Sequence, residues 1–133
     1  MTSSRILTLL VVLALVPLAA GCTFSQDGTT QSAVSNNKDS FSYAVQGAVS
    51  GTHTFTWENS KREAAYNVAV QGTGSVLISI KDPAGKTMLN REVSVTGQTS
   101  KAGIAGSGSP GEWTITLTFK NLNGQGAISI NAR

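Results

Sequence analysis

The sequence predicts an all-β fold, a single antiparallel β-sandwich, and three observations lead to this prediction. Apolar and polar residues alternate with period two over much of residues 41–133, as expected for strands with one buried face. Sequences rich in Gly, Asn, Asp and Pro interrupt the alternation at regular intervals. No stretch after the N-terminal segment has helical periodicity. A length of 133 residues allows one domain, and only 13% of the residues are charged.

The clearest strand is expected at residues 113–119, where large apolar residues hold the odd positions and threonine the even ones. The same alternation predicts strands at residues 41–45, 52–57, 66–70, 76–80, 93–95 and 128–130, with a weaker one at 101–105. Turns are expected at residues 71–74, 82–85, 110–111 and 121–124, and a loop or single helical turn at 58–65. Seven to eight strands in two sheets packed face to face follow from this pattern.

The N-terminus has the composition of a secretory signal peptide over residues 1–21. One base, Arg5, precedes an apolar run at residues 6–20, and 15 residues are too few to cross a membrane comfortably as a helix. Small residues then lead to Cys22, the only cysteine. Residues 18–22 resemble the lipobox of bacterial lipoproteins, which implies cleavage between Gly21 and Cys22 and a lipid on Cys22. The alternative is an ordinary cleaved signal that leaves Cys22 as a free thiol.

Residues 22–40 are expected to form the lipidated cysteine and a flexible tether, because they are mostly Ser, Thr, Asn, Gln and Gly and bury little. The folded domain is then expected at residues 41–133. Its turn at residues 82–85, its Pro-Gly-Glu-Trp start at residues 110–113 and the closing strand at 128–130 resemble small secreted jelly-roll modules such as the bacterial pre-peptidase C-terminal domain. That resemblance implies a jelly-roll-like sandwich that serves as an accessory module and not as a catalytic domain.

Catalytic and metal-binding residues are sparse. His53 is the only histidine, so we expect no metal site and no cofactor, and we interpret His53 as a partly packed strand residue with its ring tip in water. The carboxylates are isolated in the sequence; Glu58 and Glu112, each next to a tryptophan, are the best pair for a hydrolase. Residues 106–111 match the Gly-x-Gly-x-x-Gly spacing, but a strand follows them, so a hairpin loop is expected. We therefore predict no enzyme.

Two threonine arrays are the candidate binding surface. Thr52, Thr54 and Thr56 alternate on one expected strand and Thr114, Thr116 and Thr118 on another, so the six hydroxyls would form one polar patch if the strands were neighbours. The simpler interpretation is that threonine is a favoured exposed strand residue. Trp57 and Trp113 are expected in the core, with a sugar-stacking surface as the alternative.

Taken together, the sequence predicts a protein exported across the inner membrane and held by lipid in the cell membrane or outer membrane, on a side that the sequence does not determine. A non-catalytic binding or structural role is expected. Contact with an envelope protein through an exposed sheet edge comes first, glycan binding like that of a carbohydrate-binding module second, and a small envelope hydrolase third. Lysines and arginines are scattered, so no nucleic-acid partner is expected.

Overall fold

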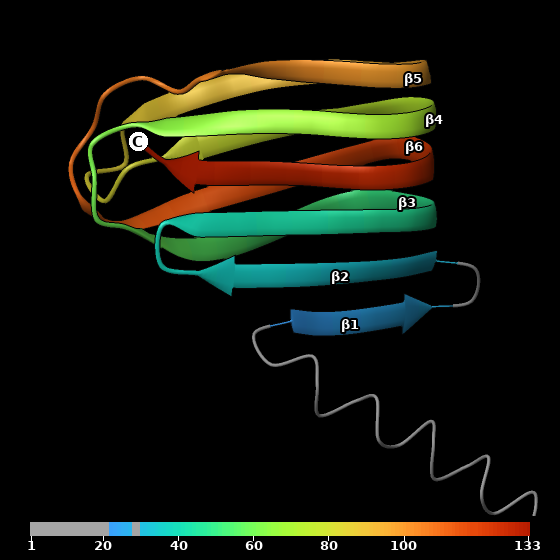
Figure 1. Cartoon of the computed structure of the whole chain (residues 1–133), viewed down its shortest axis with the longest axis horizontal. Coiled ribbons are helices and arrows are strands. Elements are labelled where there is room, and N and C mark those ends of the chain that lie inside the picture. Colours follow the sequence, from blue (N-terminus) through green and yellow to red (C-terminus); the bar gives the residue numbers. More distant parts are fainter. Residues whose placement is uncertain (1–21, 28–29) are drawn as a thin grey trace, which may run out of the picture.

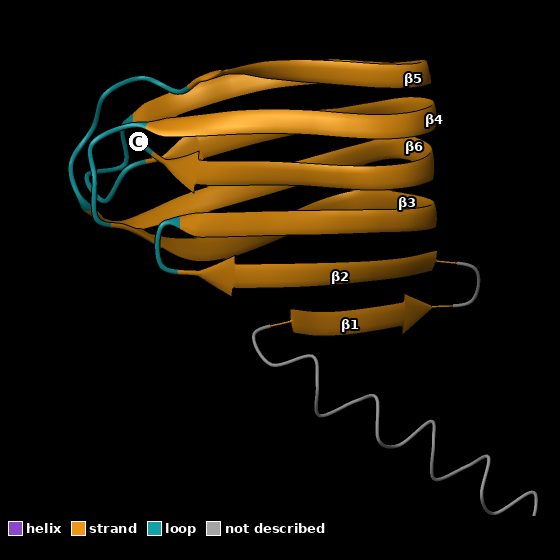
Figure 2. Cartoon of the chain, viewed as in Figure 1, coloured by secondary structure: helices purple, strands orange, loops and turns teal. Residues whose placement is uncertain are grey.

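The computed structural model describes residues 22–27 and 30–133, with side chains from residue 33 onward. In this part of the chain every regular element is a strand, and no helix is present that is long and apolar enough to cross a membrane. Figures 1 and 2 show six strands. They are β1 (Cys22–Asp27), β2 (Thr30–Asn37), β3 (Ser40–Asn59), β4 (Ala64–Lys81), β5 (Thr87–Ile104) and β6 (Gly111–Ala132).

The strands form one antiparallel sheet in the order β1-β2-β3-β6-β4-β5. Strand β6 lies between β3 and β4, so the last strand of the chain pairs with these two and not with β5, which directly precedes it in sequence. Each of the four long strands bends near its middle, and the sheet thereby folds over on itself into two layers, one in front of the other in Figure 1. The sandwich is one sheet folded in half.

We call the front layer of Figure 1 layer A and the one behind it layer B. Layer A contains β2, the first halves of β3 and β4 and the last halves of β5 and β6; layer B contains the other halves of the four long strands. Because the two halves of each long strand lie in opposite layers, residues far apart along one strand contact each other. Phe41 and Phe55, both in β3, have ring centroids 5.2 Å apart across the core.

Glycines at the bend, which we call the crease, permit the fold. A Cβ on Gly72 would lie 2.1 Å from the carbonyl oxygen of Asn123, and one on Gly124 would lie 2.3 Å from that of Gln71. These distances are far below van der Waals contact, so the backbones of β4 and β6 can approach this closely only without side chains. Pairing irregularities between Val49 and Gly51 and between Thr73 and Ser75 add the extra twist that a bent strand needs.

The core fills the space between the layers. Apolar side chains of alternate residues from both layers are buried, including Trp57 and Trp113, whose rings meet edge to face with centroids 6.2 Å apart. Both indole N–H groups are satisfied: that of Trp57 donates to the carbonyl of Asn37 at 3.0 Å, and that of Trp113 to the carbonyl of Ser109 at 2.7 Å. The two tryptophans therefore also hold neighbouring segments against the core.

Two aspartates organise the end of the sandwich opposite the crease. Asp39 has a left-handed φ of 65° and accepts hydrogen bonds from the backbone N–H of Ser60 at 2.7 Å and from its hydroxyl at 2.6 Å. Asp82 is buried and accepts backbone N–H groups of Ala84 and Lys86 in its own turn and of Ser109 in a distant loop. Each carboxylate thus joins segments that are remote in sequence.

The all-β antiparallel prediction is confirmed, and the strand count of seven to eight is corrected to six among the described residues. Residues 71–74 and 121–124, expected to be turns between separate strands, are bends inside continuous strands instead. The expected turns at 82–85 and 110–111 do lie between or at the start of strands. Divided at their bends, the four long strands give eight halves, which pair within the two layers in the order of a jelly roll, so the expected jelly-roll-like sandwich is confirmed.

The flexible tether expected at residues 22–40 is not what the structure shows. Residues 30–37 pair with β3 as β2, and residues 22–27 pair with β2 as β1. Polar residues are compatible with these positions because main-chain hydrogen bonds hold the strands in the sheet. The expected signal peptide at residues 1–21 lies outside the described residues.

Adding one methyl group at the crease should be severely destabilising. Gly72→Ala places its Cβ against the carbonyl of Asn123, and we expect a loss of about 3 kcal/mol or more of the free energy of unfolding, or failure to fold. Gly106→Ala is the matched control, because its nearest neighbour would be 3.5 Å away. Urea unfolding of both variants measures the difference; equal midpoints would contradict the close approach of β4 and β6.

Asp39 should make stability depend on pH. Hydrogen bonds from the Ser60 hydroxyl and N–H lower the pKa of Asp39 from its usual value of 3.8. A lowered pKa in the folded state contributes stability above the unfolded pKa, and this contribution is lost as the pH falls through the folded value. Asp39→Asn keeps a residue that tolerates positive φ. We expect this variant to be less stable than the parent at pH 7 and the difference to shrink below about pH 4; a difference independent of pH would be the contrary result.

Candidate functional site

The two threonine arrays lie side by side on the outer face of layer B. Strands β3 and β6 are neighbours, and their register pairs Thr52 with Thr118, Thr54 with Thr116 and Thr56 with Thr114. The hydroxyl oxygens of Thr52 and Thr118 are 3.2 Å apart, within hydrogen-bond distance. We call this two-by-three array the threonine grid. The two strands are neighbours, and the six threonines form the single polar patch that was expected in that case.

A second polar array, which the sequence analysis did not identify, lies on the outer face of layer A next to the crease. Gln46 of β3 is in register with Gln125 of β6, Gln125 with Gln71 of β4, and Gln71 with Gln98 of β5. The backbone register continues to Gln31 of β2 and Gln26 of β1. We call the four exposed side chains of the long strands, Gln46, Gln125, Gln71 and Gln98, the glutamine row.

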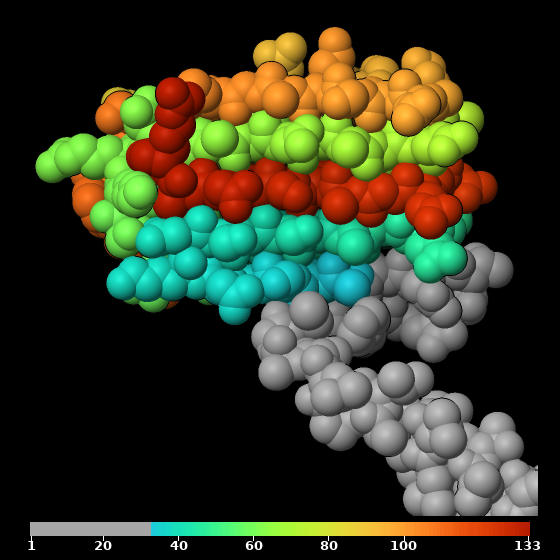
Figure 3. All heavy atoms as spheres, in the orientation of Figure 1, coloured from blue at the N-terminus to red at the C-terminus, as the bar shows by residue number. Residues whose placement is uncertain are grey.

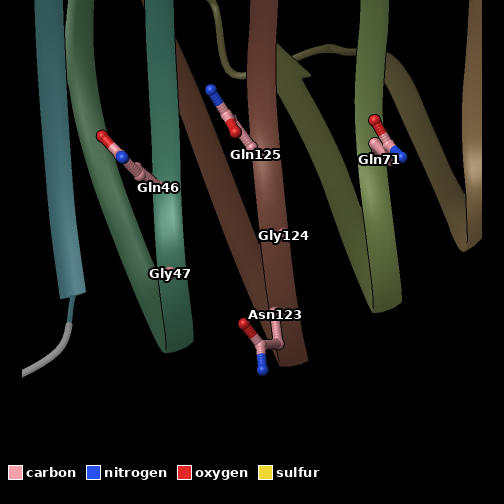
Figure 4. A pocket seen from close by; sticks show the side chains of 6 residues that line it. All are labelled: Gln46, Gly47, Gln71, Asn123, Gly124 and Gln125. Carbon is pink, nitrogen blue, oxygen red and sulfur yellow. The ribbon is translucent and has the colours of Figure 1, made fainter.

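Figure 4 shows side chains of three neighbouring strands of this row at similar height, with Asn123 closer to the crease. Neighbouring strands are about 4.8 Å apart, so the amides recur at that interval across the sheet. All four are exposed, and none is hydrogen bonded to another described residue. Each amide therefore presents its carbonyl oxygen and its N–H groups to solvent.

The glutamine row is a ridge with a depression along each side. One depression, at the crease, is lined by Gln46, Gln71 and Gln125 together with Gly47, Asn123 and Gly124. The other is lined by Gln71, Gln98 and Gln125 together with Ala69, Val70, Thr99 and Ser100. Gly47 and Gly124 line the first depression, and Ala69 and Ser100 line the second. In register with them are Gly72 and Gly97 on the first side and Ala44 and Ala127 on the second.

The outer face of layer A carries no charged residue at its outward positions on the four long strands. Figure 3 views this face. From the crease toward the loops, its rows after the glutamines are Ala44, Ala127, Ala69 and Ser100; then Ser42, Ser129, Asn67 and Ala102; then Ser40, Asn131, Ala65 and Ile104. The terminal Arg133 lies at the loop end, away from the glutamine row. Layer B, in contrast, carries an exposed ion pair between Lys120 and Glu92 at 3.0 Å.

Neither tryptophan offers a sugar-stacking surface. Trp57 is 1% exposed and Trp113 is fully buried, so the expectation that both belong to the core is correct. Among the described side chains no aromatic ring is exposed, and Ile104 is the exposed large apolar residue. On the outer face of layer A, recognition of a ligand would therefore rest on hydrogen bonds and small apolar contacts.

His53 lies between the layers, where its ring is 6.0 Å from that of Tyr43 and 5.6 Å from that of Phe119. Its Nε2 atom is buried and has no hydrogen-bond partner, so the expectation of a ring tip in water is wrong. No nucleophile or carboxylate is hydrogen bonded to His53 in the described structure. The position is that of a packing residue between aromatic rings.

Glu58 and Glu112, the pair that a hydrolase would have used, are cross-strand partners beyond the threonine grid at the loop end of layer B. Both are exposed, and the two described depressions lie on the other layer, at the crease. Like charges directly opposite each other are unfavourable in a sheet, and nothing in the structure explains this pair. No group of three or more potential ligand residues capable of holding a metal ion occurs among the described residues.

No known protein-family model matches the chain. No curated protein matches it either. Solved structures are similar to it over part of their length. They include the carbohydrate-binding module TmCBM61 in complex with β-1,4-galactotriose, at 16% identity and a TM-score of 0.43 over 76% of this chain and 66% of that one.

Another is the carbohydrate-binding module CBM6cm-2 from Cellvibrio mixtus lichenase 5A in complex with cellotriose, at 14% identity and a TM-score of 0.46 over 86% of this chain and 94% of that one. The polysaccharide-assembling protein CapF from Staphylococcus aureus has 12% identity and a TM-score of 0.43 over 84% of this chain. This chain spans 28% of CapF and 23% of an arabinofuranosidase, MgGH51. TM-scores below 0.5 do not assign the chain to any of these groups.

A signal for the glutamine row was present in the sequence. Gln and Gly are adjacent at 46–47, 71–72, 97–98 and 124–125, with the order reversed in the last two. Neighbouring strands of an antiparallel sheet run in opposite directions. A Gln-Gly pair on one strand and a Gly-Gln pair on the next therefore predict one row of glutamines beside one row of glycines. The interpretation of residues 71–74 and 121–124 as turns hid that pattern.

Proposed function

We propose that this chain is a lipid-anchored, non-catalytic protein of the cell envelope that binds glycan on the outer face of layer A. The observation that carries the proposal is the glutamine row: four exposed amides from four strands, in register and flanked by two depressions. The site is built by the fold, because the strand register and the crease position all four side chains.

The chemistry of the row suits sugars. A primary amide has two N–H donors and a carbonyl acceptor, and sugar hydroxyls both donate and accept hydrogen bonds. The four amides have no partner to give up among the described residues, so binding would replace only water. Short side chains beside the row leave room for a ring to lie against the sheet.

Protein contact, the first expectation from the sequence, has less support on these faces. Stable protein interfaces usually centre on aromatic, Met or Arg side chains in a dehydrated patch. The outer face of layer A has no exposed aromatic or charged residue at its outward positions, and its one large apolar side chain, Ile104, lies at the loop end. Hydrogen-bonding side chains dominate, which favours a hydroxylated ligand.

Anchoring is the second component of the proposal, and it is carried by the lipobox-like residues that end at Cys22. Cys22 begins β1, at the opposite edge of the sheet from β5. A lipid there would attach the sandwich to the membrane by one edge strand and leave the glutamine row on an outer face. Several acyl chains on one cysteine suffice for stable anchoring, since each buried methylene contributes about 0.8 kcal/mol.

Removal of two neighbouring amides should weaken glycan binding. We expect Gln71→Leu with Gln98→Leu to reduce affinity for a retained polysaccharide about tenfold, because each lost hydrogen bond is worth about 0.5–1.5 kcal/mol. Affinity electrophoresis of the detergent-extracted full chain in gels with and without polysaccharide measures this. Thr54→Val with Thr116→Val on layer B is the matched control and should bind normally. Equal binding by the glutamine variant and the parent would refute the site.

Lipidation can be tested separately. The membrane-fraction protein should have a mass that exceeds the residue 22–133 polypeptide by a lipid-sized increment, and Cys22→Ala should lose both this increment and membrane association. Intact mass spectrometry and membrane fractionation give the two readings. An unmodified Cys22 in the parent protein would contradict the anchor without affecting the glycan proposal.

A further inference from the structure

Resting on the proposed function, we infer that the glutamine row binds internal segments of a neutral, linear polysaccharide that lies across the strands. Three properties of the face carry this inference: its lack of charge, the direction of the ridge and the way the ridge ends. Each restricts the ligand in a different way.

The lack of charge restricts the ligand class. Layer A presents Gln, Ala, Ser, Asn and one Ile at its outward positions, whereas the charged residues of the described chain lie in the loops, on layer B and on the edge strand. Lys101 of β5, in register with the buried Val68, alternates with the outward Ser100 and Ala102. Without a cation at the outward positions of this face, an anionic polymer would lose hydration and gain no ion pair there. A neutral chain avoids that cost.

The direction of the ridge sets the orientation of the ligand. The glutamine row runs perpendicular to the strands, from β3 through β6 and β4 to β5, and the two depressions flank the same row. Three inter-strand spacings of about 4.8 Å separate the outer two amides by about 14 Å. A ligand that meets all four amides must therefore be extended along the ridge, which favours an oligomer or polymer over a single sugar.

The ends of the ridge indicate internal recognition. At one end lies β5, the last strand of the sheet; at the other, the backbone register continues over β2 and β1. Neither depression is lined by a residue of the loops that connect β2 through β6, which lie at the opposite end of the sandwich. A linear chain can therefore continue past the row in both directions, and its ends need not be recognised.

The experiment measures affinity of the detergent-extracted full chain for soluble neutral glucans, galactans and mannans and for a polyuronate of similar length. Size-graded oligosaccharides of any neutral polymer that is retained follow, by isothermal titration calorimetry at low and high salt. We expect affinity to rise at least tenfold from a disaccharide to an oligomer that spans about 14 Å and then level off. Raising the salt should change it less than twofold, and reduction of the oligosaccharide's end should have no effect.

The outcomes separate the two proposals. Salt-sensitive retention of the polyuronate, equal affinity for mono- and oligosaccharides, or dependence on a free end would overturn this inference while glycan binding stands. Loss of binding in Thr54→Val with Thr116→Val, and not in Gln71→Leu with Gln98→Leu, would move the site to layer B and overturn it too. Failure to retain any polysaccharide, or capture of an envelope protein that the glutamine variant no longer captures, would overturn the proposed function itself.

Discussion

The close approach of β4 and β6 at the crease is the constraint on which the rest of the structure depends. Backbone atoms of the two strands come so near each other that a methyl group on Gly72 or Gly124 would overlap a neighbouring carbonyl. Because glycines occupy this row on all four long strands, one sheet can bend sharply and close on itself. The fold then brings Phe41 against Phe55 and forms the core between two halves of the same strands.

The same constraint produces the surface. Residues beside a row of glycines are well exposed, and the register that aligns the glycines also aligns the neighbouring glutamines. Opposite the crease, Asp39, Asp82 and the two indole N–H groups hold the loops and strand ends against the core, so the irregular backbone lies at that end. The outer face of layer A is left regular and free of charge, which is the basis for a neutral, hydroxylated ligand.

Period-two alternation was enough to predict the strands and their buried faces, because burial of every second side chain is a local property of a strand. Trp113 and Ile115 are examples, and so is the threonine side of β6. The number of strands was not predictable in the same way: Gln71-Gly72-Thr73-Gly74 has turn composition, and only pairing with β6 keeps it within a strand. Pairing between distant strands also decided the site, since Gln46 and Gln125 become neighbours only through the insertion of β6 beside β3.

The central claim is that the four glutamines form one row and act together on a glycan. The most direct measurement is a two-dimensional ¹H–¹⁵N spectrum of the protein during titration with a neutral oligosaccharide long enough to span the row, read at the side-chain amide signals. The account predicts that the signals of Gln46, Gln71, Gln98 and Gln125 shift together while the backbone signals of Thr54 and Thr116 on the opposite face stay in place. Shifts confined to the threonine grid, or to one glutamine alone, would contradict it.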